Sequence, residues 1–399
     1  MHMKKKSIFV LMLVFVLVGT TTTAFASSDF NFIVDGEEVD LGYDYVVENG
    51  RVLVTPDWAK LLLGVEITKD SLVPLRDTAE ALDYIVKWEG STKTVSLISP
   101  VNRLIGEKVM GIAATGSLLL NGEFGDLHEE IVADGHRDSE AYDAFLAVLQ
   151  EIRDINNATY VYTLIKVSED MTNLIVDAAD DPDEYGEEYE MEPQFVTAFN
   201  GSPSYAIHTW ESSYHGTQKS AFAPIYNSAG KIVALLGIDY PYDATKSDMN
   251  VLVGEKVMAI AATGSLLLNG EFGDLHEEIV ADGHRDSEVY DEFQFVLQQI
   301  RDINNATYVY TLIKVSDDMT NLIVDAAEGD DADEYGAEYE MEPQFVTAFN
   351  GSPSYAIHTW EDEWYGIQKS AFAPIYNTKG ELVALLGVDY PADVLGLIK

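Results

Sequence analysis

Cysteine is absent from all 399 residues. This absence excludes disulfide bonds, a thiol nucleophile, zinc sites built on cysteine and a lipid-modified N-terminal cysteine. Basic residues are scarce, with 24 Lys and Arg against 68 Asp and Glu, which gives a net charge of −44. Clustered positive charge is what neutralises phosphates, so nucleic acid and anionic lipid are not expected as partners.

Catalytic signatures are also missing. The chain contains no G-x-S-x-G turn, no H-E-x-x-H motif and no glycine-rich phosphate loop. Its eight histidines show no metal-ligand spacing. We therefore expect a protein that is not an enzyme, with no cofactor and no metal site.

Long apolar runs are confined to the N-terminus. Lys4, Lys5 and Lys6 precede the eleven apolar residues Ile8 to Val18, and Ala24-Phe25-Ala26 follows. This order is typical of a signal peptide, here residues 1–26, cleaved to leave a chain that begins near Ser27. The alternative is a retained anchor. Cleavage would remove three lysines and take the net charge from −44 to −47. No later stretch predicts a membrane span, so we expect a secreted or cell-wall-associated bacterial protein.

An internal duplication organises the rest of the chain. GEKVM at Gly106 recurs at Gly254, and IRDINNATYVYTLIKVS at Ile152 recurs at Ile300. Units of this length are independent domains rather than solenoid repeats. We divide the mature chain into a stalk module (residues 27–99), a first repeat (100–245) and a second repeat (246–399).

The first repeat changes period halfway along. Residues 101–120 have helical spacing, and Ser139 or Asp138 precedes a second apolar stripe that runs from Tyr142 to Ile155. The predicted strands that follow are Tyr160 to Val167, Leu174 to Ala178, Ser204 to Trp210, Gln218 to Tyr226 and Ile232 to Tyr240. A long N-terminal helix and five strands in one antiparallel sheet predict an α+β fold for each repeat.

The stalk module alternates short elements. Its predicted strands are Phe30 to Val34, Arg51 to Val54, Ile85 to Trp88 and Thr94 to Ile98, and its predicted helices are Trp58 to Leu63 and Asp77 to Leu82. A core of about 70 residues is expected to be only modestly stable.

The stretch Ser220 to Pro241, SAFAPIYNSAGKIVALLGIDYP, resembles the closing hairpin of Cache domains, which are PAS-like extracytoplasmic sensor modules of bacteria. YVYTL, LIVDAA and the long first helix stand in the order of that fold. The resemblance covers both repeats, about 270 residues. It implies two PAS-like Cache domains, each with a small-molecule pocket between the sheet and the loops over it.

The stalk module resembles the copper amine oxidase N-terminal-like module of secreted Gram-positive proteins. The matching residues are Glu48 to Arg51, Val73 to Arg76, Ala79 to Leu82, Trp88 and Thr92 to Val95, and Asp83 replaces the usual glycine. Residues 27–99 contain no His, Cys or Met, so copper binding is not expected there.

The resemblance assigns a role to the aspartate that ends the last strand, since in Cache domains this residue often holds an amine. Here it is Asp239, and Asp389 in the second repeat. A carboxylate after an apolar strand is partly desolvated and requires a cation or hydrogen-bond donors. The alternative is an aspartate that caps the end of the strand.

Strand parity supplies neighbours for this aspartate. Gln218, Ser220 and Phe222 share one face while Lys219 points to the other, and Trp210 is predicted to share a face with His208. Aromatic rings around an ammonium group would complete the site, unless they are ordinary packing. The candidate ligand-binding residues are Tyr162, His208, Trp210, Tyr214, Ser220 and Asp239, with Tyr310, His358, Trp360, Trp364, Ser370 and Asp389 in the second repeat.

Three functions remain open at this point. The first is a secreted binding protein for a small extracellular metabolite, resembling an amine or amino acid, with two pockets. The second is a wall-associated structural or adhesion protein, with cell-wall or surface proteins as partners, whose repeats are spacers. The third is an unrecognised hydrolase. A pocket that holds Asp239 among aromatic rings favours the first, and an occluded core favours the second.

Overall fold

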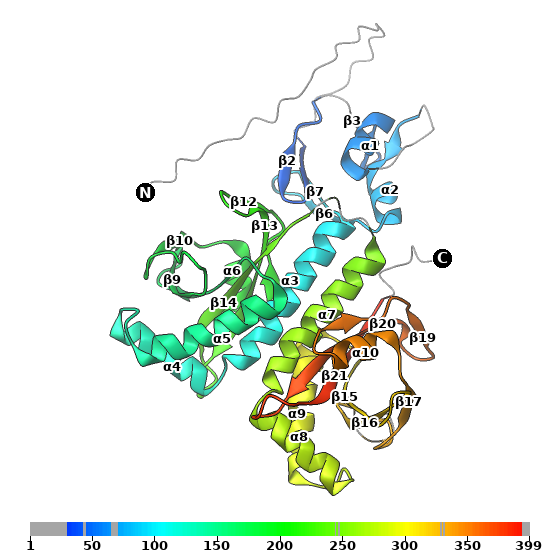
Figure 1. Ribbon diagram of the computed structural model, residues 1–399. Helices are drawn as coiled ribbons and strands as arrows, with labels where there is room; N and C mark the ends of the chain where they lie inside the picture. Colours follow the sequence, from blue (N-terminus) through cyan, green and yellow to red (C-terminus); the bar gives the residue numbers. More distant parts are fainter. Residues whose placement is uncertain are drawn as a thin grey trace, which may run out of the picture.

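The computed structural model describes residues 30–42, 45–64, 71–243, 245, 248–327, 329 and 332–392. The predicted signal peptide lies outside these residues. The stalk module contains two small sheets, ordered β2-β1-β7-β6 and β3-β4-β5. Its strands are β1 (Asn31–Val34), β2 (Glu37–Val39), β3 (Tyr45–Glu48), β4 (Arg51–Val54), β5 (Val73–Pro74), β6 (Ile85–Glu89) and β7 (Thr94–Ile98). Its helices are α1 (Pro56–Leu63) and α2 (Leu75–Ala81), which lie beside the sheets (Figure 1).

The first repeat is built on one antiparallel sheet ordered β10-β9-β8-β14-β13-β11, with β12 also paired to β13. Its helices are α3 (Pro100–Leu119), α4 (Glu123–Asp134), α5 (Glu140–Asn156) and α6 (Pro193–Phe199). Its strands are β8 (Tyr160–Lys166), β9 (Met171–Asp177), β10 (Glu188–Glu190), β11 (Ser204–Tyr205), β12 (Trp210–Ser212), β13 (Gly216–Tyr226) and β14 (Ile232–Pro241).

Two faces of this sheet pack differently. Helices α3 and α5 cover one face, where their apolar stripes join the main hydrophobic core. Helix α6 lies over the other face, where Leu164, Phe195, Phe222 and Leu235 belong to a separate small core. Lys219 is buried beneath α3 while Ser220 and Phe222 face the α6 side, which confirms the predicted parity of β13.

The second repeat has the same order of elements and the same sheet topology. Its helices are α7 (Met249–Leu267), α8 (Glu271–Asp282), α9 (Glu288–Asn304) and α10 (Pro343–Phe349). Its strands are β15 (Tyr308–Lys314), β16 (Met319–Asp325), β17 (Glu338–Glu340), β18 (Ser354–Tyr355), β19 (Trp360–Asp362), β20 (Gly366–Tyr376) and β21 (Leu382–Pro391). The predicted α+β fold class, a long helix on an antiparallel sheet in each repeat, is confirmed.

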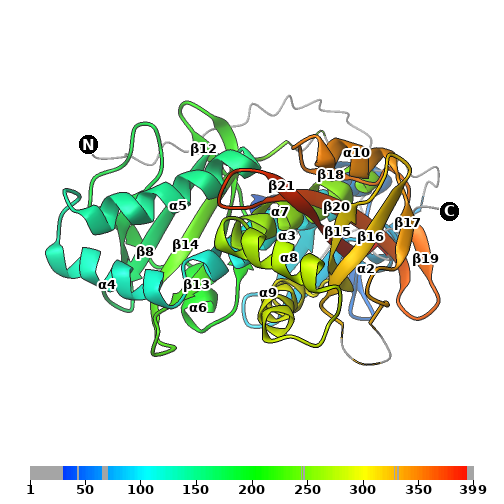
Figure 2. The ribbon, with the colours of Figure 1, turned by 60° about the horizontal axis from the view of Figure 1, so that its bottom comes forward.

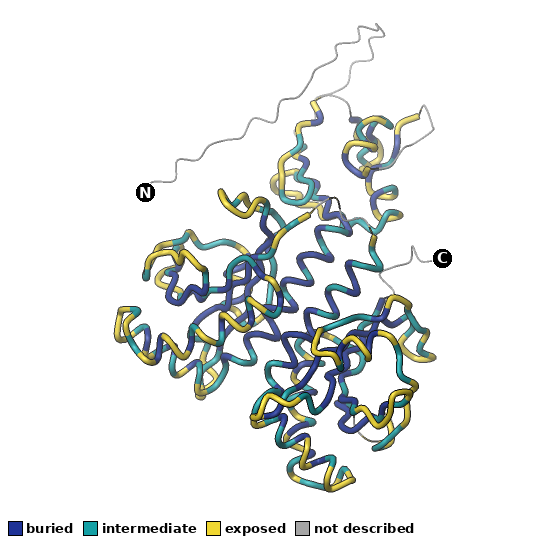
Figure 3. Tube along the Cα trace, viewed as in Figure 1, coloured by how far each residue is buried: buried dark blue, intermediate teal, exposed yellow. Residues whose placement is uncertain are grey.

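The two repeats pack through their first helices, α3 and α7, which lie side by side in both ribbon views (Figures 1 and 2). Glu107 accepts from Lys256 at 2.8 Å, and Glu255 accepts from Lys108 at 3.3 Å. Further along, Gly111 packs against Ile260, so residue numbers rise together and the helices run in the same direction. The reciprocal contacts relate the repeats by an approximate twofold axis. One buried cluster contains residues of both repeats, so α3 and α7 form the centre of a shared core (Figure 3).

Among the described helices, α7 is long and apolar enough to cross a membrane by length and composition. Two thirds of that stretch is buried inside the protein. Its apolar residues pack against α3 and β20, which explains the composition as that of a core helix.

One predicted strand is wrong. Ser204 to Trp210 was expected to be continuous, but residues 206–209 separate β11 from β12. The carbonyl oxygen of Ile207 accepts from Asn102 Nδ2 at 3.0 Å and from Lys219 Nζ at 2.7 Å, so two side chains take the place of a neighbouring strand. Helices α4 and α6 were also not predicted. Gly125 in α4 packs so closely that a Cβ atom there would lie 2.3 Å from Tyr226 O, and this glycine interrupts the apolar pattern.

Candidate functional site

Asp239 lies near the end of β14 on the face that α6 covers. In the backbone register it stands between Ser220 of β13 and Tyr160 of β8. Only 4% of Asp239 is exposed. The strands therefore place a carboxylate, a hydroxyl group and a phenol in one row across the sheet.

Tyr162 reaches this row from the next position along the face. Its hydroxyl group lies 3.5 Å from Asp239 Oδ1, and its ring crosses β14 directly over Gly237. A Cβ atom at Gly237 would lie 2.5 Å from the Tyr162 ring, so only glycine leaves room for this crossing. The spacing Gly237-x-Asp239 thus has a physical reason: the glycine seats the tyrosine that contacts the aspartate.

Trp210 also belongs to the cluster around Asp239. Its indole Nε1 donates to Ser220 Oγ at 3.0 Å, and its ring stacks on Tyr160 with centroids 6.0 Å apart. Trp210 is 37% exposed and also hydrogen-bonds the buried Asp239, so its ring reaches from the carboxyl group to the surface.

Burial dominates the electrostatics of Asp239. Desolvation raises the pKa of this carboxyl to about 7, although hydrogen bonds from Ser220, Trp210 and Tyr162 act in the opposite direction. The negative charge of Asp177, at the end of β9, raises the pKa of Asp239 further. Within the described part of the chain, no Lys, Arg or His side chain forms an ion pair with Asp239.

The second repeat reproduces the cluster. Ser370, Asp389 and Tyr308 form the row, Tyr310 OH lies 3.5 Å from Asp389 Oδ1, and Trp360 Nε1 donates to Ser370 Oγ at 2.9 Å. Desolvation likewise raises the pKa of Asp389 to about 7.

Four predicted residues of each repeat meet in this way, and two do not. Tyr214 and Trp364 are 87% and 86% exposed at the tips of the β12–β13 and β19–β20 hairpins, so they do not face Asp239 or Asp389. Both residues lie between the predicted strands, in the turns that join β12 to β13 and β19 to β20, and these turns hold the two rings in solvent.

The two predicted histidines also lie elsewhere. His208 Nε2 lies 3.3 Å from Glu192 Oε2, and His358 Nε2 lies 3.5 Å from Glu342 Oε2, both on partly exposed surfaces. His208 stands in the interrupted segment 206–209, which removes it from the face that Trp210 occupies.

Sequence reasoning missed two members of the site. Tyr160 was detectable by parity, because it precedes Tyr162 by two positions on the same strand. Asp177 stands opposite Tyr162 and accepts from the backbone N–H groups of Ala179 and Asp183, both at 2.9 Å. The chain contains so many carboxylates that its sequence does not single out Asp177 as a buried one.

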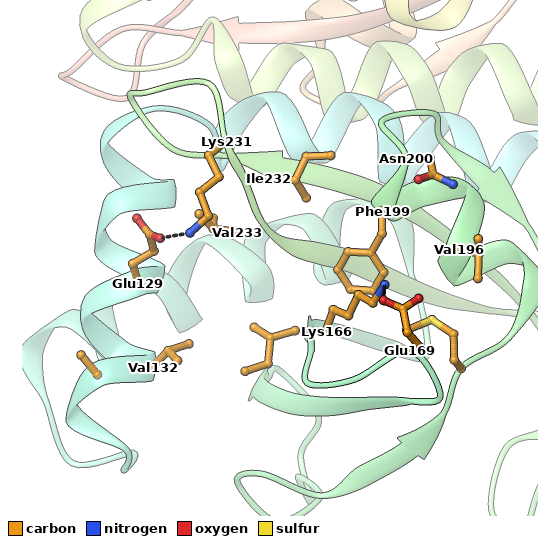
Figure 4. Close-up of a pocket in the computed structure, with 13 residues that line it drawn as sticks. Glu129, Val132, Lys166, Glu169, Val196, Phe199, Asn200, Lys231, Ile232 and Val233 are labelled. Carbon is orange, nitrogen blue, oxygen red and sulfur yellow. Dashed lines mark hydrogen bonds and ion pairs between the residues drawn. The ribbon is translucent and has the colours of Figure 1, made fainter.

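A separate open pocket of about 710 Å³ lies at the opposite end of β14 (Figure 4). Ile232 in its wall is seven positions before Asp239, which is about 24 Å along a strand. Lys231 pairs with Glu129 at 3.0 Å at its rim, and Lys166 pairs with Glu169 at 2.9 Å. Its lining residues are Glu129, Val132, Ala133, Ile165, Lys166, Glu169, Met191, Val196, Phe199, Asn200, Lys231, Ile232 and Val233. Glu381 stands where the first repeat has Lys231, so this rim is not the same in the two repeats.

Metal ligation has no support within the residues that the structure describes, because no three His, Cys, Asp or Glu side chains gather there in a way that holds an ion. The cluster at Asp239 offers neutral donors, aromatic faces and two buried carboxylates, of which Asp177 is already bound by two backbone N–H groups. This arrangement suits a single positive charge that is itself a hydrogen-bond donor.

No family model and no curated protein sequence matches the chain. Among solved structures, the E. coli DcuS sensor domain is similar over 38% of this chain and 98% of its own length, with 15% identity and a TM-score of 0.28. The V. cholerae histidine kinase DctB sensor domain covers 73% of this chain and 94% of its own, with 12% identity and a TM-score of 0.27. The sensory domain of the Campylobacter jejuni chemoreceptor Tlp3 covers 74% and 95%, with 10% identity and a TM-score of 0.19.

Proposed function

We propose that the chain is a non-catalytic extracellular binding protein whose two repeats each bind a small amine- or amino-acid-like metabolite at Asp239 and Asp389. The observation that carries the proposal is a buried carboxylate surrounded by neutral donors with no cationic partner among the described residues. Such a group is costly to bury, and a bound ammonium group would supply the missing counter-ion.

Aromatic rings support the same ligand chemistry. Tyr162 and Trp210 both contact the row that contains Asp239, and Trp210 stacks on Tyr160. An ammonium group bound to the carboxylate would lie close to these ring faces, which favour cations. Trp210 would move to admit the ligand, because this partly exposed side chain hydrogen-bonds the buried Asp239.

The test is a binding screen on the mature chain. Thermal shift with amines, amino acids, purines and organic acids is followed by calorimetry on each compound that stabilises the protein. We expect amines or amino acids to bind and organic acids without an amine not to bind. Asp239→Asn removes the charge at nearly constant size, and loss of a partly buried charge partner of this kind typically costs about 2–5 kcal/mol, or about 30- to 5,000-fold in affinity. Asp389→Asn should abolish the second site alone.

A structural role is the second candidate, and the closure of the site favours it. Asp239 is buried, and Ser220, Trp210 and Tyr162 already provide donors. Under this alternative the repeats are spacers that the stalk module, which resembles a copper amine oxidase N-terminal-like module, attaches to the cell wall. A chain that binds nothing in the screen and that loses stability in Asp239→Asn would support the spacer role.

Export belongs to the same proposal. Residues 1–26 are proposed to be removed, so mass spectrometry of a culture supernatant should find an N-terminus near Ser27. Recovery of the chain in the membrane fraction with Ile8 to Val18 intact would contradict secretion.

A further inference from the structure

The two sites differ in charge at one place, which is the hairpin beside the cluster that both repeats share. Ser212, Ser213 and His215 in the first repeat correspond to Asp362, Glu363 and Tyr365 in the second. The row that contains the buried aspartate is the same in both repeats. The second site therefore has two additional carboxylates near an otherwise identical cluster.

Asp362 is held on the side of the sheet where Asp389 lies. Tyr308 stands directly opposite Asp389 in the strand register, and its hydroxyl group donates to Asp362 Oδ2 at 3.0 Å. The Tyr308 ring also stacks on Trp360, with centroids 6.3 Å apart. Tyr308 thus stands beside Asp389 in the sheet and bonds Asp362 through its hydroxyl group. In the first repeat, Tyr160 makes the matching contact with the neutral Ser212 at 3.1 Å.

The pKa values of Tyr308 and Asp362 shift in the directions that this contact predicts. Burial, the hydrogen bond to Asp362 and the charge of Asp362 raise the pKa of Tyr308, with smaller contributions from Tyr365 and Asp389. The backbone N–H groups of Trp364 and Tyr365 each donate to Asp362 Oδ1 at 2.7 Å, and these bonds lower the pKa of Asp362. Asp362 is therefore ionised at neutral pH, and its position is fixed by three hydrogen bonds.

Trp360 and Asp362 are two positions apart on β19, so they share one face at a separation of about 7 Å. We propose that the second repeat binds a molecule with two ammonium groups, one at Asp389 and one at Asp362, whereas the first repeat binds a molecule with one. The inference rests on the proposed amine-binding function of both sites. It assigns the difference in ligand class to Asp362 and its counterpart Ser212.

The experiment uses the full mature chain and two probes, butylamine and 1,4-diaminobutane, which have the same carbon chain and differ by one ammonium group. Asp239→Asn leaves only the second site competent, and Asp389→Asn leaves only the first. By calorimetry, the second site should bind the diamine about fivefold more tightly than the monoamine, the gain expected from one partly exposed ion pair. The first site should show no such preference.

Exchanging the two residues provides the matched controls. Asp362→Ser, in the Asp239→Asn background, should remove the preference, so that the ratio of diamine affinity to butylamine affinity falls to the value measured at the first site. Ser212→Asp, in the Asp389→Asn background, should create the preference in the first repeat. Both side chains are on a partly exposed hairpin, and circular dichroism checks that each variant is folded. Added salt should weaken the diamine preference more than monoamine binding, because the outer ion pair is more exposed.

The outcomes separate the two proposals. If neither probe nor any other amine binds either site, the proposed function itself is wrong. If both probes bind through Asp239 and Asp389 but Asp362→Ser leaves the preference intact, the amine-binding function stands and the role of Asp362 is overturned.

Discussion

Asn156 of the first repeat donates from Nδ2 to Thr263 Oγ1 of the second at 2.9 Å, and Asn304 donates to Thr115 Oγ1 at 2.8 Å in the reciprocal position. All four side chains are buried. These bonds join the end of α5 to α7 and the end of α9 to α3, so each repeat completes the polar contacts of the other. The tandem repeats form a single core with approximate twofold symmetry rather than two independently folded domains.

The repeats should consequently unfold together. Thr263→Val removes the acceptor of Asn156 inside the core and should lower the free energy of unfolding by about 1–3 kcal/mol. Urea denaturation should show one transition that coincides by tryptophan fluorescence and by far-UV circular dichroism. Thr197→Val, on the exposed surface of α6, is the control and should change stability by less than about 0.5 kcal/mol. Two separate transitions in the wild type would contradict the shared core.

Much of this fold was predictable, since the period of apolar residues located α3, α5 and the strands β8, β13 and β14 to within a few residues. Parity then placed Ser220 beside Asp239, because a regular antiparallel pair has a fixed register. The interface between the two repeats was not predictable. The apolar pattern of α3 and α7 shows that these helices are buried, but it does not show that they are buried against each other. The place of His208 was not predictable either, because residues 206–209 are irregular and this irregularity depends on the contacts of Ile207 with Asn102 and Lys219.

Stability should depend on pH through Asp239 and Asp389, and burial raises the pKa of Asp177 and Asp325 in the same direction. Burial raises the folded-state pKa of Asp239 to about 7, well above the ordinary value of 3.8 for an aspartate, so the folded protein binds more protons than the unfolded chain between these values. The free energy of unfolding should therefore fall as pH rises from about 4 to about 7 and level off above that, by about 4 kcal/mol for each such carboxyl.

Asp239→Asn cannot ionise and isolates this effect. The variant should match the wild type near pH 4 and become more stable than it above pH 7, as measured by urea denaturation at each pH. Asp154→Asn is the surface control, since its side chain is about two thirds exposed, and should follow the wild type. A wild type that remains as stable as Asp239→Asn at pH 8 would show that Asp239 is not held in a desolvated site.

Ligand affinity should have the opposite dependence on pH. An ammonium group binds the ionised carboxylate, so affinity for butylamine should rise about tenfold for each pH unit below about pH 7 and level off above it. Binding at pH 6 should release close to one proton per site, which calorimetry detects by repeating the titration in buffers of different ionisation enthalpy. Affinity that does not change between pH 5.5 and pH 8 would argue against recognition by Asp239 and Asp389.

Trp210 and Tyr214 should differ sharply in their contribution to binding. Trp210→Phe keeps an aromatic ring but removes the Nε1 donor to Ser220, so amine affinity at the first site should fall about fivefold to tenfold. Tyr214→Ala removes a side chain that is 87% exposed and should leave affinity unchanged. Calorimetry in the Asp389→Asn background measures both. A loss of binding in Tyr214→Ala would mean that the hairpin tip folds over the ligand.

The stalk module contacts the first repeat at Gly36, in the turn between β1 and β2. Gly36 has a φ angle of +91°, and a Cβ atom there would lie 2.6 Å from the Cα atom of His208. Next to it, Asp35 accepts from the backbone N–H and the hydroxyl group of Ser99, both at 2.7 Å, at the start of α3. Because the close contact is with backbone rather than with a flexible side chain, His208 cannot rotate away to make room.

Gly36→Ala should therefore separate the stalk module from the first repeat. Gly42→Ala is the matched control: Gly42 also has positive φ, +57°, but nothing lies within 4 Å of its Cβ position, so it carries only the backbone cost of about 1–2 kcal/mol. Hydrogen exchange should show faster exchange at the start of α3 and in residues 206–209 for Gly36→Ala alone. Equal protection in the two variants would show that the turn can shift, and that Asp35 and Ser99 hold the stalk in place without the close approach at Gly36.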